Sequence, residues 1–414
     1  MKNLSNKILV IVFIGFLALS LLLTSVVKFG DIVSSLYENK EQLFNYSTAF
    51  STLSSAFSGN LMFIEKYADI YGGIHKAQGN NAVWTESFKK TYVVGSDGKL
   101  YLCTLFDKSK TEVNEQGITE SNKKTLTECA EALSDFAEKI TKKDIDFFFV
   151  QAPDRYDPEC VDLPVSMMST GMASINYLSD LLKDDENINL LNLQEYFHEQ
   201  NIPFDDWFFA TDHHWTIKMA FSAYQKICEM INVETDIEID EFYYNNENWN
   251  CDIIEKVFLG SLGKNTGNGF IEKDDLELIY PNFETDYVVV STSRGNPYVT
   301  IEKGDSVTLE GTYTDAVFNT HETPFSYSSY LGGDLCEIRV TNSKVATDKK
   351  ILVIKDSFAL PVSAFLSTCF AETRLLDPRY FHEDIYEYIN SYEPDMVLVL
   401  YNPGAYSIDP FFSF

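Results

Sequence analysis

The sequence predicts an α/β protein in which helices flank a parallel sheet, joined to one N-terminal membrane-spanning helix. Two stretches, 121–233 and 346–401, alternate amphipathic helical patterns with short, uninterrupted apolar runs. Uninterrupted apolar runs are typical of strands buried on both faces of a parallel sheet. The 414 residues, 45% of them hydrophobic, are sufficient for two or three domains with a large core.

The N-terminus predicts an uncleaved membrane anchor. Residues 8–27 carry no charge and are numerous enough to cross a bilayer as one helix. Lys2 and Lys7 precede this run, and a positive flank stays on the cytoplasmic side. Because no small-x-small cleavage site follows the run, we expect an anchor at 1–28 and an extracellular remainder that spans the membrane once.

The elements of the first half follow in order. A stalk is expected at 29–60, and Lys90 to Phe106 form a β-hairpin around a glycine-containing turn. The region 61–233 is expected to be the first part of the α/β domain. Its pattern predicts helices at 121–142, 173–182, 194–200 and 216–231, and strands at 144–150 and 188–193.

The second half begins with a region of different amino-acid composition and then returns to the α/β pattern. Residues 234–345 are rich in Asn, Asp, Glu and Tyr, and strands are predicted at 287–291, 298–301 and 306–309. We interpret this region as an inserted β-rich subdomain. The second part of the α/β domain, 346–414, is predicted to have strands at 350–354, 373–376 and 396–401 and helices at 360–371 and 383–391.

Charge and cysteine content exclude several classes of protein. With 32 basic and 62 acidic side chains, the net charge of −30 argues against binding nucleic acid. The seven cysteines include no C-x-x-C pair, which predicts neither a disulfide framework nor a zinc site. We expect most of them to be small buried residues.

The run Asp212-His-His-Trp is the strongest chemical signal in the chain. A carboxylate two positions before an imidazole, at a turn entering a helix, can orient His214 and stabilise its charge. Such a base requires a nucleophile, and Ser357 follows the strand 350–354 directly before a helix. Backbone N–H groups at that turn, together with the Asn402 amide after strand 396–401, can stabilise a developing oxyanion.

Each of these residues also has a purely structural interpretation. Ser357 and Asp212 can be helix N-caps, Asn402 can build the turn before Pro403, and Trp215 can be a core or wall residue. The acidic and histidine side chains around position 212 can also hold zinc or manganese. The sequence lacks the H-x-x-x-H spacing of common metal sites, so we predict no metal here and no cofactor.

At these residues the chain resembles the DHHW family, which is similar to the alginate O-acetylation proteins and the SGNH hydrolase-like superfamily. Further stretches fit the pattern: 147–156, 331–334, 349–358, 377–381 and 394–402. The Asp-x-His pair precedes the serine, as in the alginate-type proteins. Lys355 stands where the usual Gly-Asp-Ser block has glycine.

The resemblance implies an SGNH hydrolase-like fold and a serine triad. It implies Ser357 as nucleophile, His214 as general base and Asp212 as its orienting acid, with Asn402 at the oxyanion. Tyr401, Arg379 and Trp215 are candidates for contact with substrate. It also implies a membrane-bound O-acyltransferase as the partner that delivers acyl groups.

The sequence therefore predicts a membrane-anchored, extracytoplasmic O-acetyltransferase that acts on an exopolysaccharide or cell-wall glycan. A carbohydrate esterase with the same triad remains an alternative, because only the final acceptor differs. A catalytically silent protein that binds or assembles polysaccharide is the third possibility.

Overall fold

The fold is described from a computed structural model. Contacts divide the chain into two compact units, Met1–Gly79 with Thr266–Phe270, and Asn80–Asn265 with Ile271–Phe414. The structure describes residues 15, 18–38, 64–85, 90–103, 118–162, 170–292, 299–304, 317–318, 326–407 and 410–414.

The first unit contains helices α2 (Phe29–Glu38) and α5 (Ile64–Ala77). Among the described residues, no single helix is long and apolar enough to cross a membrane. The paired helices Ala18–Val27 and Phe29–Tyr37 meet the length and composition together, with a bend of 69° between them. Residues 1–14 and 16–17 of the predicted anchor and residues 39–60 of the predicted stalk lie outside the described part of the chain.

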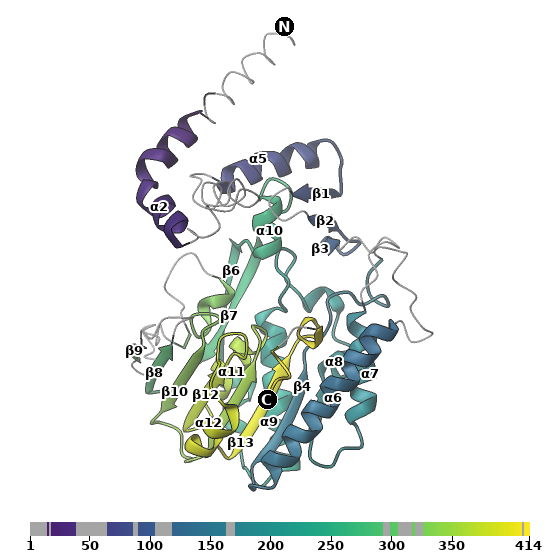
Figure 1. The fold of residues 1–414 in the computed structure, drawn as a ribbon, viewed down its shortest axis with the longest axis vertical. Coiled ribbons are helices and arrows are strands. Elements are labelled where there is room, and N and C mark those ends of the chain that lie inside the picture. The colour runs from purple at the N-terminus through teal and green to yellow at the C-terminus, as the bar shows by residue number, and fades with distance from the viewer. Residues whose placement is uncertain are drawn as a thin grey trace. The chain divides into compact units, whose positions relative to one another are not determined.

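The second unit is built on an eight-stranded sheet with the order β5-β4-β13-β11-β12-β10-β8-β9 (Figure 1). Its parallel part runs from β5 to β12, and every neighbouring pair within it is parallel. These strands are β5 (Asn189–Asn192), β4 (Asp146–Gln151), β13 (Met396–Tyr401), β11 (Lys350–Lys355) and β12 (Glu372–Leu376). The predicted parallel sheet is therefore present.

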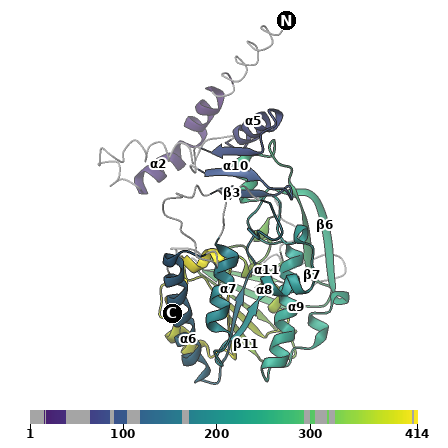
Figure 2. The ribbon, with the colours of Figure 1, turned by 90° about the vertical axis from the view of Figure 1, so that its right-hand side faces the viewer.

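Helices cover both faces of this sheet. Alternate strand residues divide between two apolar clusters: Phe148 packs with α9 and α11, whereas Phe149 packs with α6, α7 and α12. Figure 2 shows α6 and α9 on opposite sides of the sheet. The helices are α6 (Glu120–Thr141), α7 (Gly171–Leu182), α8 (Leu193–Glu199), α9 (Ile217–Glu234), α11 (Ala359–Leu366) and α12 (Ile385–Tyr392).

The described strands of the region 234–345, predicted as a β-rich subdomain, divide between two sheets: β6 (Trp249–Phe258) and β7 (Asp274–Pro281) pair with each other, and the other three join the main sheet. Its strands β10 (Glu337–Asn342), β8 (Tyr287–Thr292) and β9 (Val299–Gly304) extend the main sheet from β12 by antiparallel pairing. The buried side chains of Ile338 and Val340 join the same apolar cluster as Phe148. Residues 305–316, which include the predicted strand 306–309, lie outside the described part of the chain.

Two smaller sheets accompany the main one. Strands β1 (Ala82–Thr85), β2 (Lys90–Val94) and β3 (Leu100–Cys103) form an antiparallel sheet that contains the predicted hairpin. Strands β6 (Trp249–Phe258) and β7 (Asp274–Pro281) form an antiparallel pair with a bulge, and helix α10 (Ser261–Thr266) follows β6.

Candidate active site

The Asp212 loop is a closed turn at the start of α9. Phe208 and Trp215 form an isolated antiparallel bridge across it, and the Phe209 N–H donates to the His214 carbonyl at 3.3 Å. Thr216 then caps α9, because its side chain accepts a hydrogen bond from the Met219 N–H. The loop therefore holds Asp212 and His214 in a fixed relation.

Ser357 lies in the turn between β11 and α11. The strand ends at Lys355 and the helix begins at Ala359, so the turn is only a few residues long. Asp356 Oδ1 accepts the Phe358 N–H at 2.8 Å, which fixes the backbone on either side of the serine. Ser357 itself remains partly exposed.

The structure brings Asp212, His214 and Ser357 into one hydrogen-bonded chain. The His214 Nδ1 lies 2.5 Å from Asp212 Oδ1, and its Nε2 lies 2.7 Å from Ser357 Oγ. Burial alone would raise the pKa of the Asp212 carboxyl, but the hydrogen bond and charge of His214, and the charge of His213, hold that pKa well below its ordinary value. Asp212 is therefore ionised at neutral pH, and its negative charge can stabilise a positive charge on His214.

The neighbouring His213 lies beside this chain of bonds, with its ring centroid 3.8 Å from that of His214 and its Nδ1 3.5 Å from Asp212 Oδ1. Its Nδ1 lies 2.9 Å from Ser261 Oγ, and half of its side chain is exposed. Loss of water around the ring, together with repulsion from His214, lowers the pKa of His213 to about 4. His213 is therefore neutral near pH 7 and adds no positive charge to the site.

The sequence did not indicate the groups that hold the Asp212 loop through hydrogen bonds to its backbone and to its side chains. The Ser261 N–H donates to Asp212 Oδ2 at 2.5 Å. Asp274 accepts the N–H groups of Ala210 and Thr211 and the Thr211 hydroxyl. These groups come from β7 and the start of α10, distant in sequence, and Gly260-Ser-Leu-Gly263 is the one local signal that marks a close approach.

Arg155 is a second missed residue. It is buried and donates to the carbonyl oxygens of Leu100 at 3.0 Å, Phe209 at 2.7 Å and Ala210 at 3.4 Å. It joins the hairpin strand β3 to the residues that precede Asp212. A buried guanidinium requires hydrogen-bond acceptors, and these carbonyl oxygens supply them. Arg155 therefore fixes the loop backbone and is not assigned to ligand binding.

Trp215 lies behind the histidine, and its predicted contact with substrate is not supported. Its side chain is fully buried, and its Nε1 donates to the Tyr327 hydroxyl at 2.9 Å. Tyr327 in turn donates to the Phe358 carbonyl at 3.1 Å and stacks on the His214 ring, with centroids 4.0 Å apart. Trp215 and Tyr327 therefore fix the plane of the His214 imidazole.

Asn402 lies beside the serine turn, but its amide has an internal partner. Its backbone N–H and its Nδ2 both donate to Asp356 Oδ2, at 2.6 and 2.5 Å, and its Oδ1 accepts the Gly404 N–H. Burial raises the pKa of the Asp356 carboxyl to about 6, although these donors and the cations Lys355 and Arg379 oppose the rise. Only the second Nδ2 hydrogen of Asn402 is left for a ligand.

Arg379 belongs to a buried ionic network instead of the predicted substrate contact. Its Nη2 lies 2.6 Å from Asp377 and 3.0 Å from Asp334. The fully buried Lys355 Nζ lies between the same two carboxylates, at 2.7 Å from Asp334 and 3.1 Å from Asp377. The lysine that replaces the expected glycine is thus neutralised within the fold.

Tyr401 also faces away from any open site. Its side chain is fully buried, and its hydroxyl donates to the Phe411 carbonyl at 2.9 Å. It packs edge-on against the Phe411 ring. The predicted contact with substrate is therefore not supported for Tyr401, which stabilises the C-terminal segment.

A cleft of about 610 Å³ opens next to the three hydrogen-bonded residues. Its wall includes Phe358 and Asn402, which flank the serine turn, and His213 and Ser261, which bond around Asp212. The other wall is formed by the 153–156 segment and by side chains of β2, β3, α6 and α7.

The alternative metal interpretation of the same residues has a geometric basis but a chemical obstacle. Ligand atoms of Asp212, His213 and His214 lie within 4.8 Å of one another. However, both ring nitrogens of His214 are already bonded, to Asp212 and to Ser357. A metal ion there would have to displace the serine or the aspartate, so we assign no metal to these residues.

Comparison with known proteins identifies solved structures with a similar fold. No family model matches the sequence, and neither does any curated protein. Among solved structures, PatB1 of Bacillus cereus is similar with a TM-score of 0.60 at 22% identity, over 78% of this chain and 99% of PatB1. A PatB1 structure with a sulfonyl adduct gives 0.57 at 23% identity, over 70% and 93%. A DHHW family protein from Eubacterium siraeum gives 0.54 at 17% identity, over 80% and 95%.

The similarity at these identities is one of fold. It defines an α/β architecture that this chain shares over most of its length. The structures with this fold include a DHHW family protein, in agreement with the resemblance seen in the sequence.

Proposed function

We propose that this chain is an O-acetyltransferase that transfers an acetyl group through Ser357 to a hydroxyl of an extracellular or cell-wall glycan. The observation that carries the proposal is the continuous hydrogen-bonded chain from Asp212 through His214 to Ser357. A serine hydroxyl becomes a competent nucleophile when an oriented imidazole can take its proton.

The chemistry follows from these contacts. His214 Nε2 accepts the Ser357 Oγ proton while Oγ attacks the acetyl carbonyl of the donor. The donor's leaving oxygen departs with that proton, and an acetyl ester remains on Ser357. A glycan hydroxyl then gives its proton to His214 and attacks the ester, so that Ser357 recovers its proton and the glycan carries the acetyl group. Asp212 stabilises the imidazolium in both steps.

Donors for the oxyanion lie at the serine turn. Among the described residues, the Ser357 N–H has no acceptor, whereas the Phe358 N–H is bound by Asp356. Asn402, whose Nδ2 has one hydrogen besides the one bonded to Asp356, lines the same cleft. We assign the Ser357 N–H as the first oxyanion donor and the Asn402 side chain as the second.

The cleft supports a glycan acceptor. The half-buried Tyr156 lines it together with the polar side chains of Asn122 and Asn265, whereas Tyr92 and Tyr406 are almost fully buried in its wall. An aromatic ring beside amide groups suits a sugar ring, which presents an apolar face and hydroxyl edges. With water as acceptor the same residues perform ester hydrolysis, so the esterase remains the second candidate.

The predicted setting is a cell-membrane anchor with the catalytic unit outside the cell. The uncharged run at 8–27 and the bent helix pair at 18–37 support an anchor by length and composition. A membrane-bound O-acyltransferase would then supply acetyl groups beside the anchored enzyme. That partner follows from the sequence resemblance.

The test is intact-mass spectrometry of the full chain in detergent after incubation with 4-nitrophenyl acetate. We expect one acetyl mass on the wild type and none on Ser357→Ala. An aryl sulfonyl fluoride should label the same residue, since a PatB1 structure carries a sulfonyl adduct. Adding an oligosaccharide panel separates the candidates: acetyl on a sugar supports transfer, and free acetate alone supports the esterase.

The control is Ser363→Ala, a buried serine in α11. It should retain both acetyl and sulfonyl labelling. A folded wild-type protein that acquires neither label would overturn the enzyme proposal and favour the silent glycan-binding protein.

A further inference from the structure

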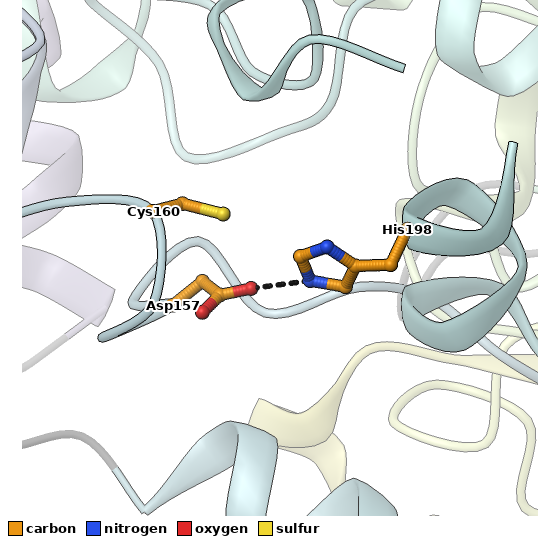
Figure 3. A group of neighbouring side chains, drawn as sticks. All are labelled: Asp157, Cys160 and His198. Carbon is orange, nitrogen blue, oxygen red and sulfur yellow. Dashed lines mark hydrogen bonds and ion pairs between the residues drawn. The ribbon is translucent and has the colours of Figure 1, made fainter. Parts of the chain in front are cut away.

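A second group of reactive side chains lies away from Ser357, between the 152–161 segment and α8 (Figure 3). Asp157 and Cys160 come from one turn, in which the Cys160 N–H donates to the Asp157 carbonyl at 3.2 Å. His198 reaches them from α8, and its Nε2 lies 2.7 Å from Asp157 Oδ2. One carboxylate oxygen, one thiol sulfur and one ring nitrogen all lie within 4.8 Å of one another.

The three ligand types define the chemistry that fits. Zn²⁺ binds cysteine sulfur, histidine nitrogen and carboxylate oxygen, whereas Mg²⁺ and Ca²⁺ prefer oxygen alone. Three protein ligands leave a fourth tetrahedral position for water. Cys160 is exposed and the His198 side chain is about one-third exposed, so an ion and its water can enter from solvent.

The geometry requires only a small rearrangement. Ligands at zinc distances and tetrahedral angles lie about 3.3–3.6 Å apart. The Asp157–His198 contact of 2.7 Å must open by less than about 1 Å, and the sulfur, which lies within 4.8 Å of both other ligand atoms, must approach by at most about 1.2–1.5 Å. The proton shared by Asp157 and His198 leaves when the metal replaces it.

The support behind Asp157 is already in place. Its side chain is fully buried, Oδ1 accepts the Glu159 N–H at 2.8 Å, and Oδ2 accepts Gln194 Nε2 at 2.7 Å. Bonds of this kind orient a carboxylate ligand and strengthen metal binding. They hold the carboxylate in one position whether or not the histidine bond is replaced.

A thiol nucleophile is the competing use of Cys160, and the surroundings oppose it. Loss of water and the negative charge of Asp157 raise the pKa of the Cys160 thiol to about 11, so it is not a thiolate at neutral pH. A divalent cation reverses this effect because it stabilises the thiolate directly.

We propose that Asp157, Cys160 and His198 form a binding site for a zinc-type divalent metal ion that fastens the 153–156 segment to α8. The preceding residues Pro153 to Tyr156 form one wall of the cleft, and Arg155 holds the backbone before Asp212. The bound ion therefore stabilises a wall of the cleft without touching Ser357. The proposal does not depend on the acetyltransfer reaction.

The test is a titration of the purified, chelator-stripped full chain with Co²⁺, followed by displacement with Zn²⁺. Thiolate coordination gives Co²⁺ an intense near-ultraviolet charge-transfer band, so the readout reports Cys160 directly. We expect stoichiometric binding and a Zn²⁺-dependent rise in Tm in the wild type. Cys160→Ser and His198→Gln should each weaken Zn²⁺ binding by more than about tenfold, since even changes behind the ligands cost that much.

Two variants serve as matched controls. Cys251→Ser removes the other exposed cysteine and should leave the band and the affinity unchanged. His213→Gln removes a member of the rival group around Asp212 and should also bind normally. Metal binding that survives Cys160→Ser, or that is lost in His213→Gln, overturns the proposal, as does a wild type that gives no thiolate band. Circular dichroism of each variant verifies that it is folded.

Discussion

At the scale of a single residue, Asp212 shows how the loop orients the His214 imidazole. Its Oδ1 orients His214 and its Oδ2 is held by the Ser261 N–H. Replacing it by asparagine keeps the shape but removes the charge that stabilises the imidazolium. We expect Asp212→Asn to lower the rate of acetyl transfer from 4-nitrophenyl acetate by about 10³- to 10⁴-fold.

The control for that measurement is Asp206→Asn. Asp206 pairs with Lys218 on the surface at 2.9 Å, and its loss should leave the rate within about twofold. Equal rates for Asp212→Asn and the wild type would exclude the proposed relay.

Asp356 predicts a pH dependence of stability. Its pKa is about 6 in the folded protein and about 3.9 in an unfolded chain. Between these values the unfolded chain has lost the proton that the folded protein retains, so the free energy of unfolding falls as pH rises from about 4 to about 6. The expected loss from this group is about 3 kcal/mol, with no further change above that window.

Urea unfolding of the wild type and Asp356→Asn at several pH values measures this effect. The asparagine cannot titrate, so the difference between the two proteins should change across the window. Parallel profiles would show that the pKa of Asp356 is the same in the folded and unfolded states.

The local sequence was sufficient to predict that Asp212, His214 and Ser357 lie together, because each is marked by its neighbours. Asp212 and His214 stand two positions apart, and Ser357 follows an apolar strand. Arg155 and Tyr327 carry no such mark, since their roles arise from bonds to residues far along the chain. Tyr401 and Arg379 lie next to a strand end, but whether their side chains point into the cleft or the core depends on packing that one sequence does not reveal.

At the scale of elements, the approach between the start of α10 and the Asp212 loop requires glycine. A Cβ on Gly260 would lie 2.2 Å from Asp212 Cβ and 2.6 Å from its Cα. Gly260→Ala therefore forces the loop to shift. We expect the acetyl transfer rate to fall on the order of 10²-fold, and the free energy of unfolding to fall by about 1–3 kcal/mol.

Gly73→Ala is the matched control, because its Cβ would meet nothing closer than 3.8 Å. Gly73 lies inside α5, where alanine is the better helix former. Stability should rise slightly and activity should not change. Full activity in Gly260→Ala would show that the loop can move freely.

The parallel strands and their helices were predictable because an apolar run buried on both faces has a distinct pattern. The position of β8 and β10 at the side of the main sheet could not be predicted. Their alternating pattern predicts strands, but a strand with one buried face pairs equally well in a separate sheet or at the side of an existing one. Pairing of β10 with β12 depends on contacts between Ile338 and Leu375, which are distant in sequence.

At the scale of the whole molecule, the net charge of −30 opposes the compact state. Salt screens such repulsion, and the Debye length falls from about 30 Å at 0.01 M to about 8 Å at 0.15 M. We expect Tm to rise over this range, measured by differential scanning fluorimetry, and to rise equally with NaCl and KCl. A Tm that falls with salt would mean that attractive ion pairs dominate instead.

The order of strands in the sheet differs from their order in the chain. Strand β13 lies between β4 and β11, so Met396 pairs with both Asp146 and Ile351. During synthesis β4 leaves the ribosome long before β13. Until β13 follows, the edge of β4 that pairs with β13 has no partner strand. We expect Ser357 to reach His214 in a stable sheet only after β13 has paired with both β4 and β11. Nascent chains stalled before that point should be digested by protease and inert to sulfonyl reagents, so the reactive serine matures only when translation of this region is almost finished.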